Sequence, residues 1–381
     1  MSDLGWPLSV PVLTDGTVTL RAHTPADLEL MVETATDPEL VRWTSVPSPY
    51  DRDDAERFMT DVVAAGWDAG THQMWAIEVL DAQGRPHFAG DVAIRGRGVS
   101  TIGFALHPDA RGRGAMAAAV RLAVGEAFSS GYTEAVHWHA HVGNLASLRV
   151  AHACGFRLVA EVPALLFEKG RAIDGWHAVL LFGDLMFARR PWRGDTVLET
   201  RTAAGRPIRL RPPVETDVPR LTEAFADPDT QHWLVQTPTD SSATHTAVHR
   251  WWWRNATGQQ ATWVVADGEV DELLGQISVL DMLGVDPACG EIGYLLHPDA
   301  RGQGVLQAVL ATLVEHAFAP DGLARRRLTA AAAEGNGASL ALLRGAGFVP
   351  TGRQSAAEPL GDGTFADLHE LELFPGSSRG L

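Results

Sequence analysis

The sequence is poor in cysteine and contains no long apolar run. Its two cysteines, Cys154 and Cys289, lie in different halves of the 381 residues, which makes neither a disulfide framework nor a metal-binding spacing. No apolar run approaches the roughly 20 residues that a membrane-spanning helix needs. Residues 1–7 lack the basic region and the apolar core of a secretory signal. These absences predict a cytoplasmic protein with reduced thiols and no membrane partner.

Positive charge is scarce as well. The 31 Lys and Arg residues are outnumbered by 47 Asp and Glu residues, which gives a net charge of −16. An acidic surface repels the phosphates of nucleic acids and attracts cations. We therefore expect no nucleic-acid partner. An amine-bearing small molecule or a basic peptide is the more compatible substrate, and the oligomeric state is left open.

The chain repeats itself once. Trp43 recurs as Trp233, 190 residues later (233 − 43), and Asn144 recurs as Asn336, 192 residues later (336 − 144). This period far exceeds that of a solenoid repeat, so it indicates a duplicated domain. The prediction is an N-terminal domain, a linker, a C-terminal domain and a tail, at residues 1–190, 191–206, 207–375 and 376–381.

Each copy has the same order of expected elements. In the first copy the patterns predict helices at residues 24–32, 51–65, 115–128 and 145–153. They predict strands at residues 18–21, 74–79, 88–94, 102–106, 135–142 and 176–182, with a further strand around Leu165. An antiparallel first half followed by strand and helix alternation indicates an α+β fold. Each domain is expected to hold a mixed central sheet flanked by helices.

One loop sequence occurs in both copies, as residues 107–114 and 297–304. Each loop follows an apolar strand and precedes a helix, so backbone N–H groups and the positive helix end converge there. An ordinary tight turn is the alternative, and the spacing matches neither a Walker A loop nor a dinucleotide fingerprint. We predict two pyrophosphate cradles, formed by Arg111, Gly112, Arg113, Gly114, Ala115 and Met116, and by Arg301, Gly302, Gln303, Gly304, Val305 and Leu306.

Further motifs follow each loop: Asn-x-x-Ser at residues 144–147 and 336–339, and Gly-Phe at residues 155–156 and 347–348. In this order the motifs resemble the GNAT N-acetyltransferases, and the RimJ/RimL-like subgroup in particular, once per half. The resemblance implies two tandem GNAT-like domains that bind acetyl-CoA, with Asn144 and Asn336 in the cofactor sites. It also implies direct acetyl transfer to a primary amine through a tetrahedral intermediate. One departure is shared, because Met116 and Leu306 replace the family's small residue.

Acetyl transfer needs a base for the amine and a proton donor for the thiolate. The family often has a glutamate where Glu291 stands, whereas the first copy has Thr101; a surface ion pair is the alternative role for Glu291. The family's tyrosine is absent, because Ala151 and Leu343 occupy its positions. The resemblance then assigns the proton donor to the motif serines, for which helix capping is the alternative: Ser147 and Ser339.

The first copy has three alternating histidines, His137, His139 and His141, on one expected strand, where they share a face. A zinc site is one interpretation, but no fourth ligand is in register, and we predict no metal. A polar wall of the acceptor cleft is favoured, with His139 accepting a proton in place of the missing glutamate. The second copy has residues 330–332, all alanine, in this region.

The second copy has its own unusual residues. His245 and His249 are four apart on an expected helix, without the glutamate of a zinc-protease motif, so a helix face is favoured. Residues 251–253, all tryptophan, are expected to pack internally. The sequence thus predicts an acetyl-CoA-dependent N-acetyltransferase whose second half is the better candidate for catalysis. The alternative is a non-catalytic acyl-CoA-binding regulatory or scaffold protein.

Overall fold

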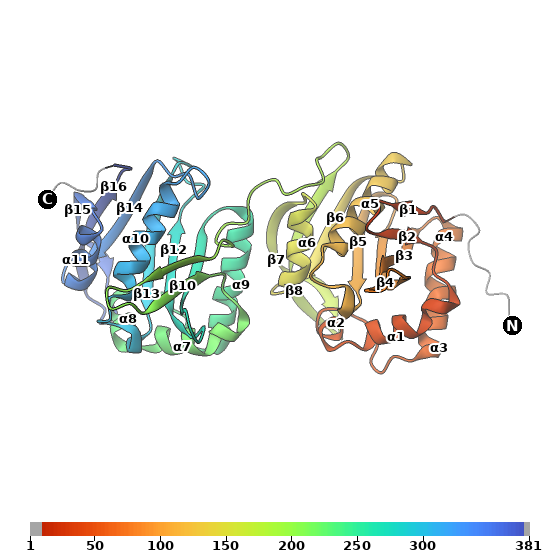
Figure 1. Cartoon of the computed structure of the whole chain (residues 1–381), viewed down its shortest axis with the longest axis horizontal. Helices are drawn as coiled ribbons and strands as arrows, with labels where there is room; N and C mark the ends of the chain where they lie inside the picture. The colour runs from red at the N-terminus through yellow and green to blue at the C-terminus, as the bar shows by residue number, and fades with distance from the viewer. Residues whose placement is uncertain (1–9, 377–381) are drawn as a thin grey trace. The chain divides into compact units, whose positions relative to one another are not determined.

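The computed structural model describes residues 10–376. The chain forms two compact units, Met1–Arg189 and Arg190–Leu381, here called the N-terminal and C-terminal units. Each unit is built around one eight-stranded sheet (Figure 1).

The sheet of the N-terminal unit has the strand order β1-β2-β3-β4-β5-β6-β8-β7. Only the β5/β6 pair is parallel, so it needs a crossover connection, which a helix provides. The other pairs are antiparallel. The strands are β1 (Leu13–Thr14), β2 (Thr19–Arg21), β3 (His72–Leu80), β4 (Pro86–Arg95), β5 (Gly98–Leu106), β6 (Thr133–His141), β7 (Arg157–Glu168) and β8 (Arg171–Leu181).

Helices cover both faces of this sheet. Leu28 and Met31 of α1 pack with Ala76 of β3 and Phe88 of β4, whereas α5 crosses over between the two parallel strands. The helical elements are η1 (Pro25–Asp27), α1 (Leu28–Thr36), α2 (Pro38–Trp43), α3 (Arg52–Arg57), a π-helical stretch (Phe58–Ala64), α4 (Ala65–Ala69), η3 (Pro108–Ala110), α5 (Ala115–Ser129) and α6 (Leu145–Ala153).

The C-terminal unit repeats this arrangement, with the strand order β15-β16-β14-β13-β12-β11-β10-β9 and a single parallel pair, β13/β14. Its elements are β9 (Leu198–Arg201), β10 (Pro207–Arg211), η4 (Glu215–Asp217), α7 (Val218–Ala226), α8 (Pro228–Trp233), α9 (Ser241–Thr257), β11 (Ala261–Asp267), β12 (Leu273–Leu280), β13 (Cys289–Leu296), η5 (Pro298–Ala300), α10 (Val305–Phe318), β14 (Arg327–Ala333), α11 (Gly337–Gly345), β15 (Val349–Pro359) and β16 (Phe365–Leu373).

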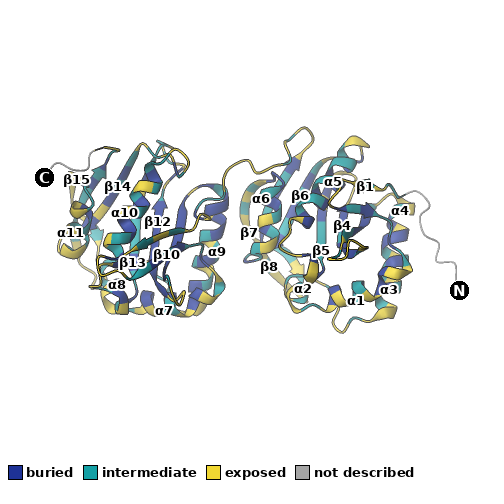
Figure 2. Ribbon diagram, in the orientation of Figure 1, coloured by how far each residue is buried: buried dark blue, intermediate teal, exposed yellow. Residues whose placement is uncertain are grey.

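The middle parts of the central strands are largely buried, as Figure 2 shows in dark blue. In the C-terminal unit, β11 is buried at every position. Trp263 and Val265 belong to one core cluster with Val309 and Leu313 of α10. Strands with both faces covered are expected to be apolar throughout instead of alternating. The core therefore lies on both sides of each sheet and holds the crossover helix in place.

The parallel strands separate before they end. Pairing of β5 with β6 runs from Gly98 opposite Thr133 to Ile102 opposite Trp138, yet β5 continues to Leu106 and β6 to His141. In the C-terminal unit, pairing of β13 with β14 runs only as far as Glu291 and Thr329. Each sheet therefore opens between its two parallel strands, toward the end of the first strand, where the crossover loop begins.

The predicted fold is confirmed: it is α+β, with two tandem domains that each have a mixed sheet flanked by helices. The structure differs in the predicted linker 191–206, because residues 198–201 form β9 and pair with β10. The predicted linker therefore contains an edge strand of the C-terminal sheet. The helix predicted at 51–65 continues to Ala69 through the π-helical stretch. The N-terminal residues 1–7 and, except for Gly376, the tail 376–381 lie outside the described residues.

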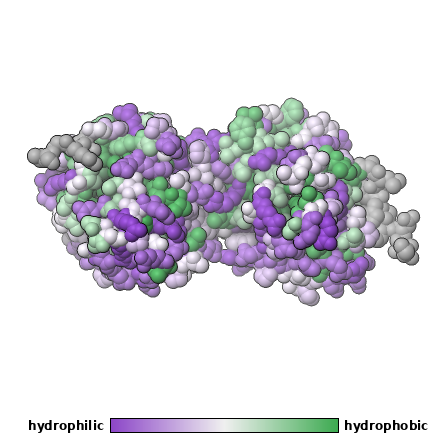
Figure 3. All heavy atoms as spheres, viewed as in Figure 1, coloured by the Kyte–Doolittle hydropathy of each residue, from purple (hydrophilic) through white to green (hydrophobic). Residues whose placement is uncertain are grey.

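No helix within residues 10–376 has the length and apolarity needed to cross a bilayer. On the face shown in Figure 3, hydrophilic residues alternate with smaller hydrophobic patches on each unit. With charged residues at 20% of the chain, such a mixed surface is expected.

Gly155 gives a test of the fold. It has a φ of +79°, and an added Cβ would lie 2.4 Å from the carbonyl oxygen of Leu185 and 2.6 Å from that of Phe187. We expect Gly155→Ala to lower the free energy of unfolding by about 3 kcal/mol, from the left-handed backbone and the steric overlap together. Urea denaturation of the full chain measures this change.

The matched control is Gly131→Ala, because Gly131 also has a positive φ (+68°) but open space where a Cβ would stand. It should lose only the backbone contribution, about 1 kcal/mol. Equal losses in the two variants would show that the contact with residues 185–187 is not tight.

Candidate functional site

Each predicted cradle ends at the start of a helix that no side chain caps. Gly114 and Gly304 are the N-cap residues of α5 and α10, with φ values of +79° and +72°, and neither first turn contains an acidic residue. A Cβ at Gly112, Gly114 or Gly304 would meet nothing within 4 Å. The first N–H groups of each helix therefore face open space beside a positive helix end, which is the chemistry of an anion site.

The loop arginines fasten the loops to the helical layer. Arg111 pairs with Asp37 at 2.6 Å, and Arg301 pairs with Asp227. Each aspartate also accepts a hydrogen bond at the start of a helix, α2 or α8. Burial opposes ionisation, but the hydrogen bonds from arginine and backbone win and lower the pKa of both aspartates. The arginines thus position the loops, and their predicted contact with the cofactor stays a prediction.

The remaining loop residues leave the helix start open. Arg113 and Gln303 bend back to the carbonyl oxygens of Asp109 and Asp299. Met116 is 5% exposed and Val305 only 1%, so these side chains pack inward. The larger residue at the family's small position therefore does not cover the N–H groups of α5. A hollow of about 290 Å³ lies here, lined in part by Arg113, Gly114 and Ala115.

The motif asparagines cap the next helices. The Asn144 side chain accepts from the Ser147 N–H at the start of α6, and Asn336 does the same for Ser339 at the start of α11, each at 3.1 Å. The asparagine is thus the capping acceptor, and the serine contributes its backbone N–H. Both serine hydroxyls remain available to other partners.

A different aromatic side chain contacts the motif serine in each unit. Trp138 of β6 donates its Nε1–H to Ser147 Oγ at 3.0 Å. In the C-terminal unit, Tyr294 of β13 shares a 2.8 Å hydrogen bond with Ser339 Oγ. By the strand registers, Tyr294 corresponds to Phe104 in the N-terminal unit, and Trp138 corresponds to Ala330 in the C-terminal unit. Each unit therefore has its aromatic hydrogen-bonding partner on the strand where the other unit has none.

Glu291 lies on β13, at the last residue paired with β14. Its side chain is exposed, yet partial loss of hydration, followed by repulsion from Asp281 and Glu358, raises the pKa of its carboxyl. The charges that act on it are acidic, which disfavours the alternative of a surface ion pair. Thr101 occupies the corresponding place in the N-terminal unit and pairs with His137.

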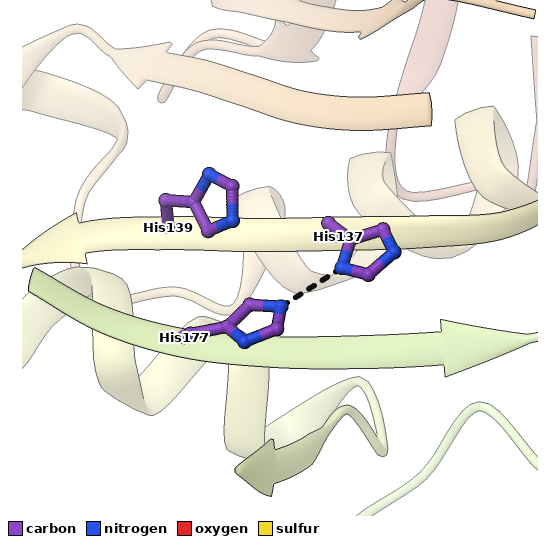
Figure 4. A group of neighbouring side chains, drawn as sticks. All are labelled: His137, His139 and His177. Atoms are coloured by element: carbon purple, nitrogen blue, oxygen red, sulfur yellow. Dashed lines mark hydrogen bonds between the residues drawn. The ribbon is translucent and has the colours of Figure 1, made fainter. Parts of the chain in front are cut away.

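The strand histidines converge with one that the sequence analysis missed. His139 lies opposite His177 of β8 in the antiparallel register, and His137 shares a 2.8 Å hydrogen bond with His177 (Figure 4). His141 instead contacts Glu168 at 3.0 Å. Burial, together with repulsion from the neighbouring imidazoles, lowers the pKa of His139 and of His177. Position 177 falls within the predicted strand, but sequence does not give cross-strand register.

The strand registers also show which residues of the C-terminal unit correspond to the three histidines. Residues corresponding to His137, His139 and His177 are Thr329, Ala331 and Glu370, so the run 330–332 does not match the histidines one for one. The second unit therefore lacks an imidazole at all three places.

A cleft of about 450 Å³ opens in the N-terminal unit where β5 and β6 separate. It brings together several predicted residues: His139, His141, Asn144 and Ser147. It also contains polar residues that sequence reasoning missed: Tyr50, Asp91, Arg95 and Glu168. Burial, followed by the charge of Asp91, raises the pKa of Tyr50 to about 12, which keeps its hydroxyl protonated. These residues belong to separate elements, and no linear motif joins them.

Comparison with known proteins identifies the family. A family model described as "Acetyltransferase (GNAT) domain" matches residues 17–157 and again residues 208–349. The chain therefore belongs to the GNAT acetyltransferase family, with two tandem domains, and is an acetyl-CoA-dependent acyltransferase. No curated protein matches the chain.

Solved structures with a similar fold include Mycobacterium smegmatis RimJ in complex with CoA-disulfide, at 20% identity and a TM-score of 0.45, covering 50% of this chain and 92% of that one. RimL in complex with coenzyme A is 23% identical, with a TM-score of 0.40, covering 45% and 96%. Ribosomal-protein-S5-alanine acetyltransferase from Vibrio fischeri is 16% identical, with a TM-score of 0.42, covering 49% and 100%.

The ion pairs that hold the loops, Arg111–Asp37 and Arg301–Asp227, predict a pH-dependent loss of stability. A lowered carboxyl pKa contributes stability that is fully present above the unfolded value, about 3.9, and disappears as the pH falls through the folded value. We expect Asp37→Asn and Asp227→Asn each to lower the free energy of unfolding at pH 7 by about 1 kcal/mol, with the deficit shrinking toward pH 3. Urea denaturation at both pH values measures it.

Asp109→Asn is the matched control, because its side chain lies in the same loop and is 81% exposed. It should leave stability nearly unchanged at both pH values. A deficit in Asp37→Asn that is the same at pH 7 and pH 3 would contradict the role given to the ion pair.

Proposed function

We propose that this protein is an N-acetyltransferase that transfers the acetyl group of acetyl-CoA to a primary amine. The acceptor is an amine-bearing small molecule or a peptide, including a protein N-terminus, and the location is cytoplasmic. One observation carries the proposal: in both units an uncapped helix start, reached through two glycines, follows the strand whose parallel pairing stops before the strand ends.

The residues fit acetyl-CoA, which supplies an activated thioester. Its pyrophosphate matches the N–H groups of residues 112–116 and 302–306, because phosphate anions suit an open helix start with positive-φ glycines. Asn144 and Asn336 hold the neighbouring helix starts. Beyond Ile102, β5 has lost β6 as a neighbour, so its backbone can offer N–H groups to a developing oxyanion.

Two different bases serve the two units in this proposal. Glu291 accepts the proton in the C-terminal unit, where its raised pKa brings it closer to neutrality. His139 takes this role in the N-terminal unit, where its lowered pKa keeps the imidazole neutral and able to accept a proton. Both groups lie at the junction of the separating strands. The cleft of the N-terminal unit supports a second catalytic centre, in addition to the one predicted around Glu291 in the C-terminal unit.

The motif serines protonate the departing thiolate. Trp138 can only donate, so Ser147 Oγ accepts from it and keeps its own proton free for another acceptor. Ser339 is coupled to Tyr294, whose hydroxyl can resupply the proton. The positions of the missing family tyrosine offer no acid, because Ala151 and Leu343 have no ionisable group; both side chains are buried in the core.

That same replacement favours a second candidate, a non-catalytic acyl-CoA-binding regulatory or scaffold protein. The two candidates differ in whether free thiol appears. A coupled thiol assay with a panel of amines and basic peptides, with mass spectrometry of the acetylated products, separates them. Acetyl-CoA binding without product under all acceptors favours the scaffold.

Two cradles predict two bound cofactors. Calorimetry should find about two acetyl-CoA per chain, with one lost in Gly304→Glu because a carboxylate would then stand where the phosphates bind. Gly304→Ala is the matched control: it shares the strain of a φ of +72° but adds no charge, so it should keep both sites. A stoichiometry of one in the unchanged protein, abolished by Gly304→Glu, would reduce the first cradle to a scaffold.

The base in the C-terminal unit is tested by Glu291→Gln in a His139→Asn background, which leaves Glu291 as the proposed base. Turnover should fall about 100-fold while acetyl-CoA affinity stays unchanged. Glu358→Gln is the control, since it removes a repulsive neighbour but not the base. It should lower the pKa of Glu291 and shift the rise of kcat/KM to lower pH. Undiminished turnover in Glu291→Gln would exclude this residue as the base.

A further inference from the structure

Three imidazole rings of the N-terminal unit meet on one face of its sheet. His137 and His139 extend from β6, and His177 extends from β8 toward them (Figure 4). One ring nitrogen of each lies within 4.8 Å of the others. Ring centroids are 5.1 Å apart for His137 and His177, and also 5.1 Å for His139 and His177. This trio brings three strong metal ligands together.

The spacing suits a single tetrahedral ion. Zinc–nitrogen bonds of about 2.0–2.1 Å at tetrahedral angles place ligand nitrogens roughly 3.3–3.4 Å apart. That separation lies between the 2.8 Å contact of His137 with His177 and the 4.8 Å limit for the whole group. Modest side-chain rotation is enough to converge on one ion. Two ligands come from alternate positions of one strand and the third from the paired strand, so the backbone already fixes their relation.

The surroundings favour a metal ion over protons. A nearby carboxylate would stabilise a protonated imidazole. The carboxylate of Glu168, however, pairs with His141 on the same strand and not with the trio. All three rings are partly exposed, and His139 lines the cleft, so an ion has a route of entry. Neutral imidazole is a preferred ligand of zinc and other borderline transition metals.

We propose that His137, His139 and His177 form a binding site for one divalent transition-metal ion, best matched by Zn²⁺, with a fourth position open to water. Three protein ligands with one open position are typical of reactive zinc sites. The sequence alone predicted no metal because it did not reveal His177 as a cross-strand partner. The proposal rests on this geometry and not on the proposed acetyl transfer.

The site has a functional consequence for the same unit. An ion bound to His139 occupies a ring lone pair that the proposed base would use. His139 can therefore either bind the metal ion or accept a proton, but not both at once. Zinc is expected to slow acetylation that depends on the N-terminal unit.

A second cluster must be separated from the first in any test. Glu215, His245 and His249 also bring ligand atoms within 4.8 Å of one another, in the C-terminal unit. All binding measurements therefore use the full chain with His245→Ala and His249→Ala as the common background. In that background the trio is the site whose loss is measured.

The experiment titrates Zn²⁺ into the metal-free background protein against a chromophoric chelator. We expect one zinc per chain. His137→Ala and His177→Ala should each weaken binding at least about tenfold, because loss of even a group that only orients a ligand costs about 10–100-fold. His141→Ala is the matched control, because it removes a histidine of the same strand outside the trio, and its affinity should be unchanged.

Circular dichroism checks that each variant folds, and His177→Gln provides a polar replacement of similar size if the alanine variant does not. Cobalt(II) supplies an independent signature, since a tetrahedral cobalt site absorbs strongly in the visible range and the variants should lose that band. Equal zinc affinity in the background protein, His137→Ala and His177→Ala would overturn the proposal, as would the lack of stoichiometric binding.

Discussion

Both halves of this protein depend on a parallel strand pair that stops pairing before its strands end. The remaining strand pairs of each sheet are antiparallel, and a crossover helix is required only where two strands run in the same direction. The crossover places a helix start beside the opened strand ends. In the N-terminal unit, Ser147 lines the cleft at that separation, and the loop glycines lead from the end of β5 into α5.

The duplication shows which features the chemistry constrains. Both copies retain the glycines, the asparagine cap and a hydrogen-bonded motif serine, but they reach that serine from different strands: through Trp138 in one and Tyr294 in the other. The proposed bases also lie on different strands, Glu291 on β13 and His139 on β6. The shared features are those that form the proposed anion site. The side chains around it diverged, which suits two units that handle different acceptors.

Sequence reasoning predicted the fold and the helices that follow the two loops, because these depend on local patterns. Strand alternation, helix starts and the repeated glycine loop can be read from neighbouring residues, and helix 145–153 agrees with the structure at both ends. The missed features depend on register. His177 belongs to the site only because β8 pairs with β6 at His139, and Tyr50 and Asp91 line the cleft only through packing. No short-range signal in the sequence carries that information.

The fastening of each loop by an arginine and an aspartate has a consequence for the history of the chain. Asp37 and Asp227 each do two jobs, capping a helix and holding the loop arginine. A mutation at either position would disturb two elements at once, and only a simultaneous change of both partners could repair it. Such a pair is difficult to lose gradually. This coupling of two roles in one residue is consistent with the presence of the pair in both copies, whereas the residues proposed to face the acceptor differ between them.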